Sequence, residues 1–154
     1  MDVGSTNGWP SCALSNFAAH EFEIDGVKCA SMEGFLQSLK HKNPEIQKHI
    51  CSLIGIKAKK AGGQNWKKHQ KLYWMNEAMD RRSPKYQKLL DRAYDALYEN
   101  QGFKAALAAA GKDAVFTHSV GRRKEGETVL TVQEFCSRLM KLKDRLFNEI
   151  KEMK

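Results

Sequence analysis

Residues 22–39 constrain the fold more than any other part of the sequence. Apolar residues alternate on both sides of the Asp25-Gly26 pair, which is the strongest short signature of a β-hairpin. Ser31 follows as a helix N-cap, and one apolar stripe then recurs at helical spacing. This stripe consists of Met32, Phe35, Leu36 and Leu39. The segment therefore predicts a hairpin that leads directly into a half-buried helix.

Helical patterns account for most of the remaining chain. Two of them open with a capping residue and then a proline in the first turn, where proline is well tolerated. The last one opens with a capping box formed by Thr131 and Glu134. We predict helices over residues 43–53 (ended by Gly55), 83–97 (closed near Gly102), 103–110 and 131–150.

The segments between these helices are less regular. Residues 1–13 are expected to form an extended lead-in, residues 57–63 a basic turn or short helix, and residues 115–117 a brief strand. A chain of 154 residues without internal repeats fits one hydrophobic core. We therefore predict a single α+β domain over residues 1–154, mainly α-helical, with one or two small β-hairpins.

Charge and cysteine content narrow the class of protein. The formal net charge of +8 favours an anionic partner such as a nucleotide or nucleic acid, although a solvated lysine-rich surface would also explain it. The four cysteines are too scattered for a zinc site or a disulfide framework. The chain shows no secretory signal and no apolar run long enough for a membrane span. We expect a cytoplasmic protein without a metal or cofactor.

The helix after the hairpin carries the most informative polar pattern. Glu33, Gln37 and Lys40 are spaced i, i+4, i+7, so they form one strip beside the apolar stripe. A carboxylate, an amide and an amine on the border of a cleft could hold a sugar and transfer protons. The helix dipole favours the ionised form of Glu33 in the first turn. The alternative is a solvated face with modest side-chain pairing.

Four other side chains could contact a nucleotide. Asn16 could hydrogen-bond a ribose or a base, and Phe17 could stack on a planar ring. Trp66 and Trp74 lie among lysines, a mixture that suits a ligand with a base and phosphates. Turn and core roles are the alternative explanation for all four.

A late charged loop could receive a phosphate. His118 and Arg122 lie on either side of Gly121, and backbone NH groups and arginines commonly bind phosphate in such loops. A structural role remains the alternative for His118. The sequence contains no P-loop, dinucleotide-binding glycine motif, zinc-protease motif or serine nucleophile elbow.

Several of these segments together resemble the NADAR, or YbiA-like, family. The resemblance extends from about Ala13 to Leu146 and is most specific in the N-terminal block. The segments that carry it are Leu14-Ser15-Asn16-Phe17, Phe22-Glu23-Ile24-Asp25-Gly26, the ten residues from Ser31 to Lys40, Ala58 to Gly62, Asn65-Trp66, and Leu139-Met140-Lys141-Leu142.

The resemblance implies a mainly helical fold and N-glycosidase activity. The substrates it suggests are ADP-ribose attached to guanine bases and ribosylamino-pyrimidine phosphates of the early riboflavin pathway. By motif, Glu33 matches the family's essential glutamate and Trp66 its site tryptophan, while Lys40 and Asn16 match conserved polar positions. Gly34 stands where many relatives have histidine. Residues 117–121 stand where many carry a Trp-Gly motif with a nearby aspartate.

These observations give one leading hypothesis and two alternatives. The leading hypothesis is an N-glycosidase that acts on a phosphorylated, nucleotide-like ribosyl compound. Glu33 would stabilise an oxocarbenium-like sugar, and Lys40 would protonate the leaving group or attack the ring-opened C1 aldehyde as a Schiff base. The alternatives are a non-catalytic basic protein that binds nucleic acid and a non-catalytic sensor of an ADP-ribose-like ligand.

Overall fold

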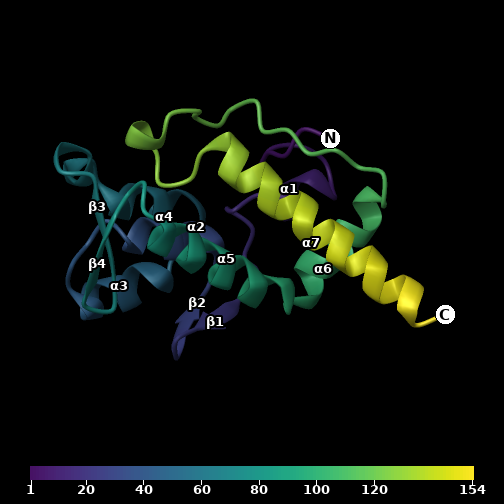
Figure 1. The fold of residues 1–154 in the computed structure, drawn as a ribbon, viewed down its shortest axis with the longest axis horizontal. Helices are drawn as coiled ribbons and strands as arrows, with labels where there is room; N and C mark the ends of the chain where they lie inside the picture. Colours follow the sequence, from purple (N-terminus) through teal and green to yellow (C-terminus); the bar gives the residue numbers. More distant parts are fainter.

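A computed structural model describes every residue from 1 to 154. Seven α-helices surround one hydrophobic core, and two separate two-stranded antiparallel sheets flank them (Figure 1). The helices are α1 (Ser11–Leu14), α2 (Met32–Ser38), α3 (Pro44–Cys51), α4 (Gly55–Gly62), α5 (Pro84–Tyr98), α6 (Gln101–Ala110) and α7 (Val132–Glu152). The strands are β1 (Phe22–Ile24), β2 (Val27–Cys29), β3 (Lys71–Trp74) and β4 (Glu77–Asp80), and two 3₁₀ turns, η1 (Asn65–Lys68) and η2 (Glu125–Glu127), complete the chain.

The predicted hairpin and the helix that follows it are confirmed. Asp25 and Gly26 both have positive φ, 50° and 79°, as the tight turn between β1 and β2 requires. The Ser31 hydroxyl then caps α2 by accepting from the Gly34 amide at 3.1 Å. A Cβ on Gly34 would lie 2.8 Å from the backbone oxygens of Ile50 and Leu53. Glycine at this position therefore lets the end of α3 pass directly against α2.

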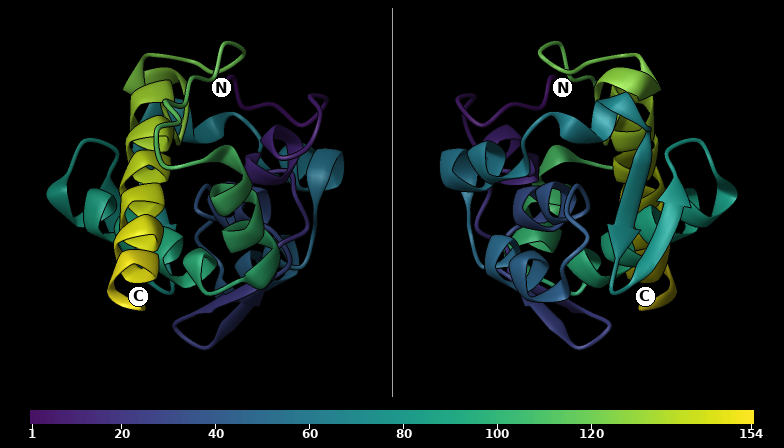
Figure 2. Two further views of the ribbon diagram at one scale, coloured as in Figure 1. Left: turned by 90° about the vertical axis from the view of Figure 1, so that its right-hand side faces the viewer. Right: turned by 90° about the vertical axis from the view of Figure 1, so that its left-hand side faces the viewer.

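The helices form two groups that meet in the core. One group is α2 with α3 and α4, and the other is α5 with α6 and the long α7. The segment from α6 to α7 runs as an extended chain along one side of the molecule, and α7 lies beside it (Figures 1 and 2). The β1–β2 hairpin and the β3–β4 hairpin project at different edges (Figure 1). No helix in the structure combines the length and apolar character that a membrane span requires.

A buried ion pair joins β4 to the start of α7. The Arg81 side chain is 0% exposed and bonds both carboxylate oxygens of Glu134, at 2.6 and 3.1 Å. Glu134 also accepts from Gln87 at 2.6 Å and from the Thr131 amide, so the predicted capping box is confirmed. Burial alone would raise the pKa of Glu134, but the bonds from Arg81, Thr131 and Gln87 outweigh it, and the net pKa is lowered.

Several sequence-based boundaries are corrected. The lead-in is not extended throughout, because α1 forms at Ser11–Leu14. Residues 115–117 form no strand and make only one isolated bridge, from Asp2 to Thr117. Gly55, which was expected to end a helix, has φ of 55° and begins α4.

Two further differences concern the later elements. Gly102 was expected to close α5, but α5 ends earlier and Gly102 lies inside α6. The second hairpin, β3–β4, forms in the lysine-rich segment where no strand was placed. Its turn residues Met75 and Asn76 both have positive φ. The buried Gln47 side chain holds this turn by donating to the Tyr73 carbonyl at 2.8 Å and accepting from the Met75 amide at 3.2 Å.

Replacing Arg81 by methionine should lower the free energy of unfolding by about 3–5 kcal/mol, because Glu134 would then be buried without its cation. Urea denaturation followed by circular dichroism measures this change. The exposed neighbour Arg82 provides a matched control, and its replacement by methionine should change the same free energy by less than about 0.5 kcal/mol. Equal losses in both variants would contradict the assignment of this stability to the ion pair.

Candidate active site

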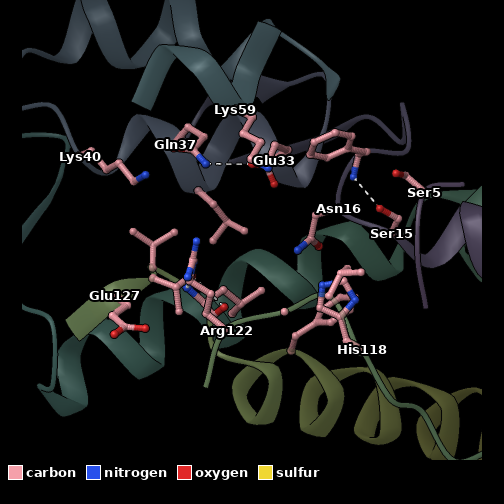
Figure 3. Close-up of a pocket in the computed structure, with 18 of the residues that line it drawn as sticks. Ser5, Ser15, Asn16, Glu33, Gln37, Lys40, Lys59, His118, Arg122 and Glu127 are labelled. Atoms are coloured by element: carbon pink, nitrogen blue, oxygen red, sulfur yellow. Dashed lines mark hydrogen bonds between the residues drawn. The ribbon is translucent and has the colours of Figure 1, made fainter. Parts of the chain in front are cut away.

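A cavity of about 650 Å³ opens between the two groups of helices. Its volume lies within the range usual for small-molecule sites. The walls come from the N-terminal segment, α2, α4, the region of η1, and the segment that precedes α7 (Figure 3). Seven of the nine residues predicted to form the site line this cavity: Asn16, Phe17, Glu33, Gln37, Lys40, His118 and Arg122.

The polar strip of α2 faces the cavity. The Gln37 side chain is 7% exposed, and its amide nitrogen donates to Glu33 Oε1 at 2.8 Å (Figure 3). Lys40 follows the last turn of α2, where its amide bonds the Gln37 carbonyl at 3.2 Å and so continues the strip past the helix end. The Lys40 ammonium donates to the Gly63 carbonyl at 3.3 Å. An acid, an amide and an amine thus share one wall.

Burial shifts the pKa values of the acid and the amine in opposite directions. Burial raises the pKa of Glu33, and the bond from Gln37 and the charges of Lys40 and Lys59 offset this only in part. The helix dipole was expected to favour the ionised form of Glu33, but desolvation has the larger effect on its pKa and favours the neutral form. Burial also lowers the pKa of Lys40 to about 8; Glu33 opposes the shift, while Lys67 and Lys59 add to it.

Asn16 is fixed from two sides next to Glu33. Its backbone carbonyl accepts from the Glu33 amide at 3.0 Å, and its side-chain oxygen accepts from the Tyr94 hydroxyl at 2.7 Å. Tyr94 is buried and makes no other side-chain hydrogen bond, so its hydroxyl proton has only this acceptor. The Asn16 NH₂ group therefore remains available to donate into the cavity, where Figure 3 shows it.

The opposite wall carries a histidine that is held by a backbone carbonyl. His118 Nδ1 lies 2.7 Å from the Val3 carbonyl, an acceptor, so this nitrogen carries a proton and Nε2 is the ring nitrogen left to contact a ligand. The imidazole packs edge-on against Phe135, with ring centroids 5.1 Å apart. A Cβ on Gly121 would lie 2.5 Å from His118 Cδ2, so glycine leaves room for the ring. His118 therefore offers a ligand only Nε2, on the wall opposite α2.

The two tryptophans predicted to bind ligand do not line the cavity. Trp74 is 4% exposed because β3 directs it into the core, where its ring packs on Phe35 at 5.0 Å. Its indole nitrogen donates to Asp25 at 2.8 Å. Trp66 is 2% exposed, and its ring lies 5.9 Å from Lys40 Nζ. The Trp66 ring thus lies beside the Lys40 ammonium, and both tryptophans are buried outside the cavity lining.

Several lining residues were not predicted individually. Lys59 on α4, Lys67 on η1 and Glu127 in the late loop are the charged ones. Lys59 and Lys67 belong to a basic region that the sequence shows only as surface charge, and no spacing rule relates them to Glu33. With Lys40 and Arg122, the cavity has four cations against two carboxylates. Its charge therefore favours an anionic ligand.

Fold and cavity together define a YbiA-like domain with a cationic, partly buried polar site. The structure matches the solution structure of Escherichia coli YbiA with a TM-score of 0.64 at 18% identity, covering 99% of this chain and 87% of that chain. The sequence matches the bacteriophage protein GP30.3 family over residues 8–144. It is also 40% identical to the uncharacterized 17.1 kDa protein in the Gp30-rIII intergenic region of Enterobacteria phage T4, covering 95% of this chain and 98% of that protein.

The chain therefore belongs to the bacteriophage protein GP30.3 family. This family is one of the NADAR-like proteins, so the resemblance found in the sequence is confirmed. The predicted mainly helical α+β fold is confirmed as well.

Lys40 should react with acetic anhydride with a midpoint near pH 8, because its buried amine has a pKa of about 8. Mass spectrometry after brief labelling across a pH series measures this midpoint. Replacing Glu33 by glutamine should move the midpoint lower, since the carboxylate stabilises the Lys40 ammonium. The exposed Glu23→Gln change serves as the matched control and should leave it unchanged. A higher midpoint in the Glu33→Gln variant would show that the two groups do not interact as described.

Proposed function

We propose that this protein is an N-glycosidase that hydrolyses the ribosyl C–N bond of a phosphorylated, nucleotide-like substrate. The substrate classes are an ADP-ribose adduct such as ADP-ribosyl-guanine and a ribosylamino-pyrimidine phosphate. The observation that carries the proposal is the placement of Glu33, Gln37 and Lys40 on one wall of a single cationic cavity. Membership in a NADAR-like family supports the same activity.

Glu33 has the position and environment to stabilise the reacting sugar. Breaking a ribosyl C–N bond builds positive charge on the sugar ring and negative charge on the leaving base. A carboxylate in a partly buried site interacts with such charge more strongly than one in water. Gln37 holds this carboxylate in one orientation through the 2.8 Å hydrogen bond. The role of Glu33 is therefore to stabilise the oxocarbenium-like sugar and to orient the attacking water.

Lys40 can act as a nucleophile near neutral pH. With a pKa of about 8, a useful fraction of its amine is uncharged at neutral pH. The amine adds to C1 of the sugar, and the C1–N bond breaks with its electron pair leaving on the base. The leaving base takes up one proton as the amine loses one. The sugar ring then opens to an imine, and water hydrolyses the imine and regenerates Lys40. The alternative role is that the Lys40 ammonium protonates the leaving base.

The remaining charges of the cavity suit the phosphates of the substrate. Lys59 lies on the side of α2, and Arg122 lies on the opposite side, so cations border the cavity on two walls (Figure 3). A concave site favours a small ligand or a single base over a polymer laid on a flat surface. If the substrate is a modified guanine within a nucleic acid, the base must leave the stack to reach Glu33.

Glu33→Gln should reduce turnover at least about a hundredfold, because the amide cannot carry the negative charge that the transition state requires. ADP-ribosyl-guanine, ribosylamino-pyrimidine phosphate and NAD would be offered in parallel, with product detection by mass spectrometry. Glu23→Gln, on the exposed face of β1, is the matched control and should retain full turnover. Near-normal turnover in the Glu33 variant would remove the carboxylate from the mechanism. Binding of ADP-ribose by the wild type without product from any substrate would instead identify a non-catalytic sensor.

Borohydride added during turnover should trap a reduced sugar adduct on Lys40, because the covalent route passes through an imine on this side chain. Peptide mass spectrometry locates the adduct. Lys40→Met should abolish it, whereas replacing the exposed Lys57 on α4 by methionine should not. Turnover without any adduct on Lys40 would exclude the covalent route and leave Lys40 as the proton donor.

A further inference from the structure

We infer that Gly62, the last residue of α4, is a positioning residue that keeps the Gln37 amide against Glu33 because it has no side chain. This inference deepens the proposed function, since Gln37 orients the carboxylate assigned to the reacting sugar. Gly62 ends the Ala58–Gly62 segment of the family resemblance, but no sequence pattern relates it to the strip, and it does not line the cavity.

The space next to Gly62 is already filled by two side chains of the strip. A Cβ on Gly62 would lie 1.7 Å from Gln37 Oε1 and 2.8 Å from Gln37 Cδ. It would also lie 3.0 Å from Cδ of Lys40. No real Cβ approaches an oxygen within 1.7 Å, so any residue other than glycine forces the Gln37 amide to move. Gly62 thus faces two of the three residues on which the proposed chemistry rests.

Backbone geometry does not explain this glycine. The helix ends at the next residue, Gly63, whose φ is 75°, a value that favours glycine. Gly62 has no positive φ and lies within α4, where alanine is ordinarily more stable than glycine. The requirement for glycine at this position is therefore spatial and comes from the side of α2.

The Gln37 amide depends on this space. Its oxygen is buried without a hydrogen-bond partner, and its nitrogen makes the one bond to Glu33. A side chain on Gly62 would displace the oxygen and turn the amide about its flexible stem, which would take the nitrogen away from Glu33. The carboxylate would lose the donor that stabilises its charge, and burial would act on it with less opposition.

The test compares Gly62→Ala, Gln37→Ala and the double variant by NMR titration of the Glu33 side-chain carboxyl carbon. The titration midpoint should rise by about one pH unit in each single variant, because each removes a hydrogen bond to the charged form. In the double variant, Glu33 should have the same titration midpoint as in Gln37→Ala alone, because the alanine at position 62 then has no Gln37 amide to displace. Gly8→Ala is the matched control: a Cβ on Gly8 meets nothing within 4 Å, and its midpoint should equal that of the wild type.

An unchanged midpoint in Gly62→Ala, or a further shift in the double variant beyond Gln37→Ala, would overturn the inference. If Gly62→Ala lowers the melting temperature of the wild type, it should lower that of Gln37→Ala by much less, and an equal loss in both backgrounds would place the clash elsewhere. The midpoint does not depend on turnover. A protein that shows these shifts but cleaves no ribosyl compound would refute the proposed function while the role of Gly62 in placing Gln37 stands.

Discussion

The close packing of α2 against α3 and α4 is the constraint on which the rest of the structure depends. Two glycines allow this packing, one at the contact of α2 with α3 and one at the contact of α2 with α4. Gly34 on α2 lets the last carbonyls of α3 reach the helix, with no room for a side chain between them. Gly62 at the end of α4 leaves the space that the Gln37 amide occupies. With α2 held on both sides, its polar strip lines the cavity, and the acid and the amine become partly buried.

This burial gives the site its chemical character. Water would stabilise the charged forms of both a carboxylate and an ammonium, and its partial removal disfavours both. The pKa of Glu33 therefore rises while that of Lys40 falls, and each keeps the other from a larger shift. With a pKa of about 8, the Lys40 amine changes protonation at little cost near neutral pH. The same amine on a solvated face would have lacked this property.

Much of the fold could be predicted because its signals are local. The Asp25-Gly26 turn, the Ser31 cap and the Thr131 capping box each depend on residues within one turn, and all three form as expected. The β3–β4 hairpin could not be found this way, because Met75-Asn76 lacks the Asn-Gly or Asp-Gly pair of a strong hairpin signal and a distant glutamine holds the turn. The burial of Trp74 in the core could not be predicted either, because it also depends on a contact that is distant in the sequence. Its lysine neighbours in sequence say nothing about Phe35, against which the fold places it.

The residues of the site likewise fall into those with a local sequence signal and those placed by distant contacts. The strip on α2 follows from helical periodicity, whereas Lys59, Lys67 and Glu127 reach the cavity only through the packing of separate segments. The late segment is also where this chain departs from the NADAR pattern, and there the Val3 carbonyl holds His118 Nδ1. His118 Nε2 and the Asn16 NH₂ group are then left to contact the ligand. In the proposed enzyme the strip on α2 supplies the chemistry, so these two groups bear on which base or sugar is accepted.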